Sequence, residues 1–248
     1  MKERYFKFKR FSVSHKKSAM PVGVDGVLVG AWADAAGARN ILDIGTGCGV
    51  IALMMAQRFP GAQIMAIDID EQSIEEADEN FRASIWSERL TARNISLQDY
   101  VPEQQGGIFD FIITNPPFFV SGVSNPDSSR LKARHDASLP LSELAMQSAR
   151  LLRDGGELAL ILPVGEPEHI FSEYALSAGL KESRKVYVRG HRNKPIKRVL
   201  MQWCKGAESG EVHHEKQYKT DAELILEDAP GHPSDAYREL CSDFYLKF

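Results

Sequence analysis

Short apolar runs alternate with amphipathic segments along the middle of the chain, and this alternation constrains the fold more than any other feature. The runs have the length of buried strands, and the segments between them place apolar residues at helical spacing. Such a pattern is typical of βαβ units and predicts an α/β fold with a mostly parallel sheet. The expected strands are at 40–45, 63–70, 94–99, 109–115 and 157–163, with a closing pair at 183–190 and 196–205, and the expected helices are at 50–59, 71–84, 141–152, 170–180 and from about Ser234.

The composition of the 248 residues is that of a globular protein from a reducing compartment. No charge-free apolar run approaches the length of a membrane span, and the N-terminus lacks the apolar core of a signal peptide. The three cysteines, Cys48, Cys204 and Cys241, are odd in number and widely spaced, which predicts reduced thiols without structural zinc. His213 and His214 stand in a polar stretch without a nearby cysteine, so we expect no metal site.

A glycine-rich turn with the sequence DIGTGCG follows the first expected strand. Gly45, Gly47 and Gly49 allow a sharp turn and a close approach of a ligand to the main chain. The dinucleotide fingerprint G-x-G-x-x-G would need a glycine where Val50 stands. With Asp43 included, the loop resembles motif I of class I S-adenosylmethionine (SAM)-dependent methyltransferases, in which it cradles the methionine and ribose portions of SAM. The alternative is a tight strand-to-helix turn that binds nothing.

Acidic residues end the next two expected strands. Asp68 lies 19 residues after the last glycine of the loop, at the spacing of an acid that binds ribose hydroxyls. Asp70 is on the same face and is the second candidate, although it is better placed to cap the following helix. The resemblance implies that Asp99 accepts a hydrogen bond from the adenine of SAM, with Leu97 or Tyr100 beside the ring. An exposed acid at a strand end is the alternative for Asp99.

The tetrapeptide Asn115-Pro116-Pro117-Phe118 follows the fourth expected strand, where the prolines must end the pairing. Ligands of open α/β sheets bind outside the carboxyl ends of the strands, so this segment and the glycine loop should face one crevice. N-P-P-[FY] at this place resembles motif IV of methyltransferases that modify a nitrogen conjugated to a ring or a carbonyl. A plain turn is the alternative.

Motif IV suits a planar amino nitrogen for a chemical reason. The lone pair of such a nitrogen is delocalised into the ring, which makes the nitrogen a poor nucleophile. Asn115 Oδ1 and the Pro116 carbonyl can each accept one N–H and aim the lone pair at the methyl group, while the prolines hold both acceptors in place. Phe118 offers a face for the base, and such stacking is worth about 1–3 kcal/mol.

The ends of the chain narrow the resemblance to one family. The run G-x-D-G-x-L-x-G-A-W at 23–32, the tripeptide ARH at 133–135 and DFYL at 243–246 are similar to those of the bacterial tRNA1(Val) adenine-N6 methyltransferases, which act at position 37 beside the anticodon. Phe118 departs from the commoner tyrosine and loses only a hydroxyl. The resemblance implies that Gly23 and Asp25 lie near the methionine end of SAM. The alternative for Asp25 is a helix cap.

The same resemblance sets the expected organisation of the chain. We expect one methyltransferase domain with a class I, Rossmann-like fold and a seven-stranded sheet with helices on both faces. It would comprise a basic N-terminal segment and first helix at 1–35, a catalytic core at 36–205 and a C-terminal addition at 206–248. We further expect a cytoplasmic monomer that uses SAM without a metal and binds the anticodon stem-loop of tRNA.

Two basic segments stand on an otherwise acidic chain. Residues 1–17 carry seven Lys/Arg against one acid, and residues 181–205 carry nine against one. Basic residues interleave with phenylalanines near the N-terminus, a pattern that suits single-stranded RNA through phosphate contact and stacking. The alternative is a solvated basic arm with a half-buried strand face. The expected RNA contacts are Lys7, Lys9, Arg10, Arg130, Arg134, Lys194, Lys197 and Arg198, and His15 and His135 are candidates for RNA contacts or packed polar residues.

Other enzymes share the N-P-P-[FY] motif. Protein glutamine-N5 methyltransferases usually carry an N-terminal helical domain, whereas here only about 40 residues precede the first strand, and this segment is basic. Guanine-N2 ribosomal RNA enzymes share the chemistry; a duplicated domain would favour this alternative, and the chain is too short for one. A DNA adenine enzyme would need a target-recognition region. A module that binds RNA or SAM without catalysis would not need the intact asparagine and glycines.

Overall fold

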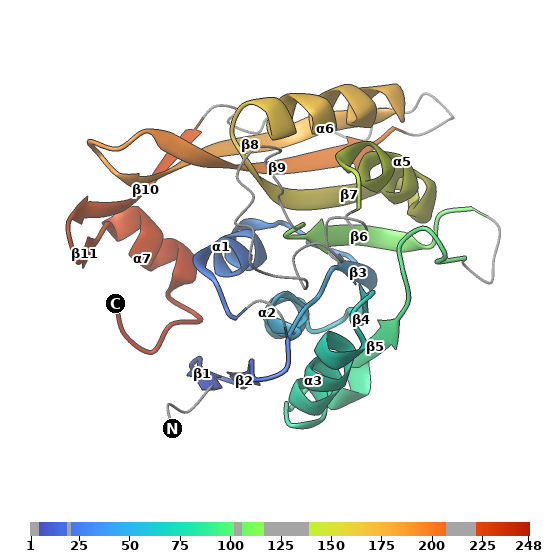
Figure 1. Cartoon of the computed structure of the whole chain (residues 1–248), viewed down its shortest axis with the longest axis horizontal. Coiled ribbons are helices and arrows are strands. Elements are labelled where there is room, and N and C mark those ends of the chain that lie inside the picture. Colours follow the sequence, from blue (N-terminus) through green and yellow to red (C-terminus); the bar gives the residue numbers. More distant parts are fainter. Residues whose placement is uncertain (1–4, 19–20, 102–105, 117–138, 207–221) are drawn as a thin grey trace, which may run out of the picture.

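A computed structural model describes the chain apart from residues 1–4, 19–20, 102–105, 117–138 and 207–221. Its centre is a nine-stranded sheet with the order β11-β10-β8-β9-β7-β6-β3-β4-β5 (Figure 1). Strands β3 to β7 run parallel, β9 is antiparallel to both of its neighbours, and β10 is parallel to β8. The strands are β3 (Asn40–Ile44), β4 (Gln63–Asp68), β5 (Leu90–Asn94), β6 (Phe109–Thr114), β7 (Leu152–Pro163), β8 (Leu180–His191), β9 (Ile196–Lys205), β10 (Ala222–Ala229) and β11 (His232–Pro233).

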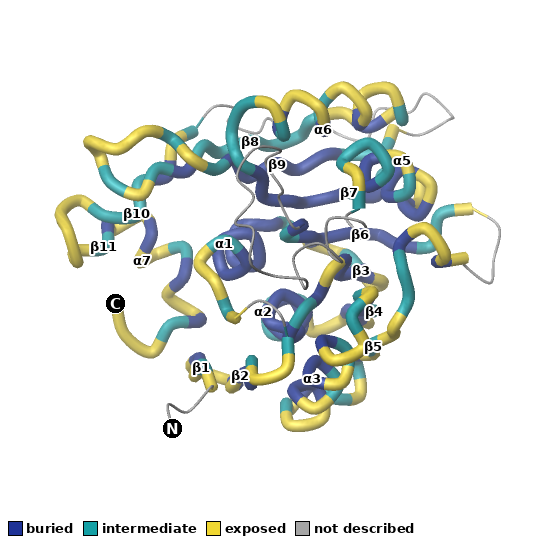
Figure 2. Tube along the Cα trace, viewed as in Figure 1, coloured by how far each residue is buried: buried dark blue, intermediate teal, exposed yellow. Residues whose placement is uncertain are grey.

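Helices cover both faces of this sheet. One face is packed by α1 (Val24–Trp32), α2 (Val50–Arg58), α3 (Glu71–Arg82) and α7 (Asp235–Cys241), and the other by α5 (Leu141–Leu151) and α6 (Glu166–Ser177). The central strands β3, β6, β7 and β9 are largely buried (Figure 2), which is why they read as apolar runs. None of the helices in the described residues is long and apolar enough to cross a membrane.

The α/β fold and its parallel sheet are confirmed, and one expected strand is wrong. The third strand is β5 at Leu90–Asn94, whereas the sequence predicted it at 94–99. Ile95 and Leu97 alternate with polar residues as they would in a strand, but Leu97 is buried within a turn. Beyond the seven predicted strands, the C-terminal segment adds β10 and β11 at the edge next to β8.

The two ends of the chain pack against each other. Strands β1 (Tyr5–Lys7) and β2 (Ser12–Ser14) form a hairpin whose turn contacts the C-terminal tail. Phe8 forms an antiparallel β-bridge with Tyr245, and Lys9 N donates to Phe244 O at 2.8 Å. Phe8 and Phe11 are buried with their rings stacked, 4.6 Å between centroids. Their rings are therefore not exposed for stacking on RNA, and the expectation of stacking by these phenylalanines is wrong.

Candidate active site

The glycine loop, residues 45–49, joins β3 to α2 with three glycines in the left-handed region. Their φ angles are +67° at Gly45, +54° at Gly47 and +82° at Gly49. A Cβ atom at Gly45 or Gly47 would find no described atom within 4 Å, whereas a Cβ at Gly49 would lie 2.5 Å from the ring of Phe81. Two glycines thus leave room beside the main chain for a ligand, and the third is required for packing against α3.

Backbone hydrogen bonds fasten this loop to the end of β4. The amides of Gly45 and Thr46 donate to Ile67 O at 2.9 and 3.1 Å, and Gly47 N donates to Asp68 Oδ2 at 2.9 Å. The loop conformation is therefore fixed by the neighbouring strand before any ligand binds, which is the preorganisation that a binding loop needs.

Asp43 lies behind the glycine loop and is fully buried. Burial raises the pKa of its carboxyl group to about 7, although hydrogen bonds from the Thr46 hydroxyl and the Ala52 backbone oppose the shift. Thr46 Oγ1 donates to Asp43 Oδ2 at 2.6 Å. The side chain thus supports the loop from behind.

The two acids after β4 have different partners. Asp68 accepts from Gly47 N and, at 3.0 Å, from Asp70 N, and burial raises the pKa of its carboxyl group. Asp70 caps α3, because its Oδ2 accepts from the amide of Ser73 at 3.1 Å and from its hydroxyl at 2.6 Å. The prediction that Asp70 is a cap is confirmed. Asp68 is the acid that lies against the loop, and a carboxylate has lone pairs left for a further donor.

Asn115 follows β6 at the same edge of the sheet, next to the end of β3. The hydroxyl of Thr114 donates to Ile44 O at 2.8 Å, which ties the two strand ends together. Asn115 Oδ1 is buried, and within the described residues it accepts no hydrogen bond. A buried acceptor without a donor is costly, which makes this atom a candidate acceptor for an external N–H. Pro116 is also buried, whereas Pro117 and Phe118 lie outside the described residues.

The first turn of α1 borders Asn115, and the sequence interpretation did not assign this role. A Cβ at Gly26 would lie 3.9 Å from Asn115 Nδ2, so the glycine brings the helix backbone close to the amide. The N-cap of α1 is Gly23, and Asp25 is not a cap. Instead, Asp25 Oδ2 accepts from Arg198 Nε at 2.8 Å, which pairs two residues that the sequence assigned to different ligands.

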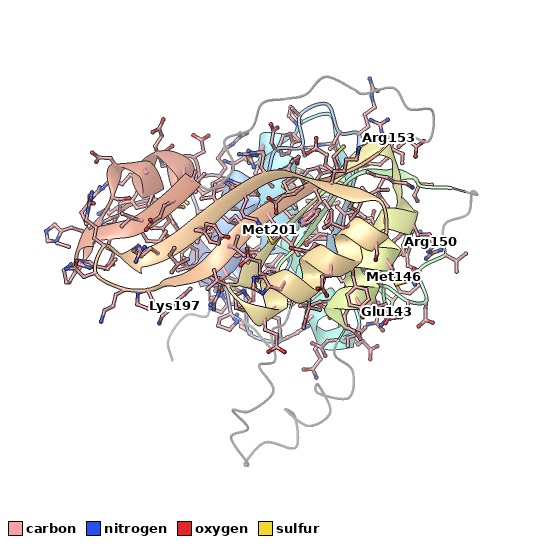
Figure 3. The ribbon with its side chains drawn as sticks, turned by 90° about the horizontal axis from the view of Figure 1, so that it is seen from above. Glu143, Met146, Arg150, Arg153, Lys197 and Met201 are labelled. Carbon is pink, nitrogen blue, oxygen red and sulfur yellow. The ribbon has the colours of Figure 1, made fainter. Side chains whose placement is uncertain are left out.

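Asp99 does not end a strand. It is exposed in a turn, where its carboxylate accepts from the hydroxyl of Ser96 at 2.6 Å. The neighbouring residues are held against α5, since Gln98 donates to Glu143 at 3.0 Å and Arg150 donates to the Tyr100 carbonyl at 2.9 Å. Glu143 and Arg150 both belong to α5 (Figure 3). The expected position at a strand end is therefore wrong, while the carboxylate remains exposed after β5.

The basic residues expected to bind RNA fall into two groups. Lys7, Lys194 and Lys197 are exposed, Lys197 near the start of β9 (Figure 3). Lys9 and Arg10 are exposed as well, but they and Arg198 have contacts within the protein: Lys9 Nζ donates to Ser242 O at 2.6 Å, the guanidinium of Arg10 lies 5.4 Å from the Trp86 ring, and Arg198 pairs with Asp25. Arg130, Arg134 and His135 lie outside the described residues, and His15 is half-buried.

Two further polar residues, Glu76 and Asn80, are buried on the face of α3 that meets the glycine loop, and the sequence interpretation missed them. The sequence could have indicated their burial, because the two polar side chains are four residues apart and lie next to Ala77 and Phe81 on the apolar face of the helix. Among the described residues, no group of three or more His, Cys, Asp or Glu side chains is placed to hold a metal ion.

Some known proteins are similar to this chain in sequence, and others in fold. Residues 27–170 match the methyltransferase small domain family. Relatives named tRNA1(Val) (adenine(37)-N6)-methyltransferase include one from Vibrio campbellii, 41% identical over 98% of this chain and 95% of the relative, and one from Christiangramia forsetii, 39% identical over 100% of both. A solved structure, a predicted O-methyltransferase from Agrobacterium tumefaciens, has a similar fold, with a TM-score of 0.62, 17% identity, and coverage of 89% of this chain and 96% of that one.

Proposed function

Since the chain belongs to the methyltransferase small domain family and, along its full length, to the tRNA1(Val) (adenine(37)-N6)-methyltransferases, we propose that it methylates N6 of adenine 37 in tRNA1(Val). SAM is the proposed methyl donor and would supply an electrophilic methyl group. As the N–CH3 bond forms, the S–CH3 bond would break and S-adenosylhomocysteine would leave, and the methylated nitrogen would lose its proton to water. The protein would act as a monomer in the cytoplasm, and residues 1–35, 36–205 and 206–248 would form one domain.

The observation that carries this proposal is the buried, unsatisfied Oδ1 atom of Asn115 at the end of β6. An exocyclic amino group brings two N–H donors into such a site. Asn115 Oδ1 would accept one of them and the Pro116 carbonyl the other, which draws the nitrogen out of conjugation with the ring. These acceptors are fixed beforehand, so the site stabilises the transition state by orientation and needs no strong base. Pro117 would hold the second acceptor, and Phe118 would stack on the adenine.

The residues around the glycine loop fit SAM. The open space beside Gly45 and Gly47 would admit the methionine and ribose portions close to the main chain, with Gly49 and Asp43 supporting the loop. Asp68 would accept from the ribose hydroxyls, and Asp99 from the adenine amino group. Gly23 and Asp25 would lie at the methionine end of SAM, and the Asp25 carboxylate would contact SAM while it also pairs with Arg198. The side chains in this set are carboxylates, which can accept from the hydroxyl and amino groups of SAM.

The anticodon stem-loop is the proposed part of the tRNA in contact with the protein. The exposed amino groups of Lys7, Lys194 and Lys197 would meet phosphates, together with Lys9, Arg10, Arg130, Arg134 and Arg198. An anticodon loop already presents unpaired bases, so turning adenine into the site costs less than it would in a duplex.

The direct test is methylation of unmodified bulk tRNA with labelled SAM, followed by nucleoside analysis. The proposal predicts label in N6-methyladenosine. Label in methylguanosine would indicate a guanine-N2 enzyme, and label in protein would indicate a glutamine-N5 enzyme; either result contradicts the proposal. Asn115→Ala protein serves as the matched control, because it should bind SAM without transferring the methyl group.

A further inference from the structure

The α3 helix carries two buried polar side chains, Glu76 and Asn80, that the proposed chemistry does not use. Glu76 is 1% exposed and Asn80 5% exposed. Buried polar groups in proteins are nearly always hydrogen-bonded, so their partners reveal what they hold. The partners come from two segments far apart in sequence: residues 12–18, named here the N-terminal strap, and the glycine loop.

Glu76 holds the strap. Its carboxylate accepts from three successive backbone amides, Lys16 N at 2.5 Å, Lys17 N at 3.2 Å and Ser18 N at 2.8 Å, and from the Ser14 hydroxyl at 2.9 Å. Successive amides around one anion form a specific, rigid site. Burial alone would raise the pKa of Glu76, but the donors of Ser18, Lys16 and Ser14 outweigh it and hold the pKa below its usual range. The anchor is therefore ionised at neutral pH.

Asn80 joins the strap to the glycine loop. Its Oδ1 accepts from Ser14 N at 2.8 Å, and its Nδ2 donates to Ser14 O at 2.9 Å and to Cys48 O at 2.8 Å. One amide group thus bonds to both segments at once. The next residue along the helix, Phe81, packs against Gly49 of the same loop.

We propose that Glu76 and Asn80 are positioning residues for the methyl donor. Seating of the strap on Glu76 fixes Ser14, Ser14 fixes the Asn80 amide, and the amide holds the Cys48 carbonyl of the glycine loop. The affinity of the loop for SAM then depends on the strap, although no atom of the strap bonds directly to the loop in the described hydrogen bonds. This inference rests on the proposed use of SAM.

A purely structural role makes a different prediction. If the two side chains only stabilise the fold, their replacement lowers the unfolding temperature and leaves the SAM affinity of the folded protein unchanged. Coupling through Asn80 instead makes SAM affinity sensitive to Glu76, whose hydrogen bonds within the described residues go to the strap and not to the glycine loop. The distinction requires both measurements on the same variants.

The test is a double-mutant cycle on the full chain, with the dissociation constant of SAM measured by calorimetry below the unfolding temperature of each variant. Glu76→Gln should weaken SAM binding about fivefold, and Asn80→Ala about tenfold. The double variant should bind like Asn80→Ala alone, because the effect of Glu76 travels through Asn80. Glu79→Gln is the matched control: it lies on the same helix, and within the described residues its carboxylate accepts from the exposed side chain of Lys17 at 2.8 Å and from no backbone amide. It should change SAM affinity less than about twofold.

Two outcomes overturn the proposal. Wild-type SAM affinity in Glu76→Gln contradicts the dependence on the strap, and additive effects in the double variant contradict the route through Asn80. If Glu76→Gln does not fold, Ser14→Ala replaces it, since it removes one hydroxyl bond to Glu76 and keeps the backbone bonds to Asn80; a wild-type affinity there counts against the proposal equally. Failure of the wild-type chain to bind SAM would instead refute the proposed function.

Discussion

The carboxyl edge of the sheet and the packed ends of the chain differ in what holds their functional groups. At the edge, backbone atoms do the positioning: left-handed glycines shape the loop, and strand ends place Asn115 beside it. At the ends, side-chain packing does it, with Phe8 and Phe11 buried so that lysines and arginines remain outside. The comparison teaches that short motifs place the groups of the proposed chemistry, whereas the proposed RNA surface depends on how distant segments pack.

The largest expected effect tests the chemical half of this comparison. Asn115→Ala removes the buried acceptor and should lower the rate of methyl transfer about a thousandfold, equivalent to about 4 kcal/mol. SAM affinity should stay within a few-fold, since the loop is untouched. Transfer from labelled SAM and calorimetry measure the two quantities. A variant that loses SAM binding would show that Asn115 belongs to the methyl donor's site instead.

Phe8→Ala tests whether the N-terminal phenylalanines pack or stack. Because the ring is 4% exposed, its removal should cost about 3 kcal/mol of unfolding free energy, measured with urea. At a temperature where the variant is folded, tRNA affinity should change less than about twofold. Unchanged stability with weakened tRNA binding would restore the stacking interpretation.

Gly49→Ala tests how far backbone geometry controls the loop. The residue has φ +82°, and a Cβ would meet the Phe81 ring. Backbone strain and overpacking together should therefore lower the free energy of unfolding by about 2 kcal/mol. Gly37→Ala is the matched control: its φ is also +82°, yet a Cβ would find nothing within 4 Å, and it should cost about 1 kcal/mol. Urea unfolding of both variants gives the difference, and equal costs would contradict the packing role of Gly49.

The smallest effects compare the two proposed RNA surfaces. Lys7→Ala at the hairpin and Lys197→Ala near the start of β9 should each weaken tRNA binding about threefold. Each should also lower the magnitude of the slope of the logarithm of the binding constant against the logarithm of salt concentration by about 1, the value for one lost phosphate contact. Lys181→Ala is the control, because Lys181 is exposed at the opposite end of the β8–β9 pair. The Lys181→Ala variant should bind tRNA like the wild-type chain. If Lys7→Ala or Lys197→Ala also binds tRNA like the wild-type chain, the surface around that lysine does not contact tRNA.

Much of the site could be predicted because it is local in sequence. The glycine loop, the Asp70 cap and the asparagine after β6 each follow from a few consecutive residues. Three features could not be predicted, because they depend on segments that meet only in the folded chain. The burial of Phe8 needs the C-terminal tail, the pairing of Asp25 needs Arg198, and the roles of Glu76 and Asn80 need the strap. The third strand was misplaced because alternation within a turn resembles a strand.

The measurement that tests the central claim most directly uses two transcripts of unmodified tRNA1(Val), one with adenine and one with guanine at position 37. With labelled SAM and the wild-type chain, the account predicts methyl transfer to the first transcript, recovered as N6-methyladenosine, and none to the second. Equal labelling of both transcripts would place the reaction elsewhere in the tRNA and contradict the account.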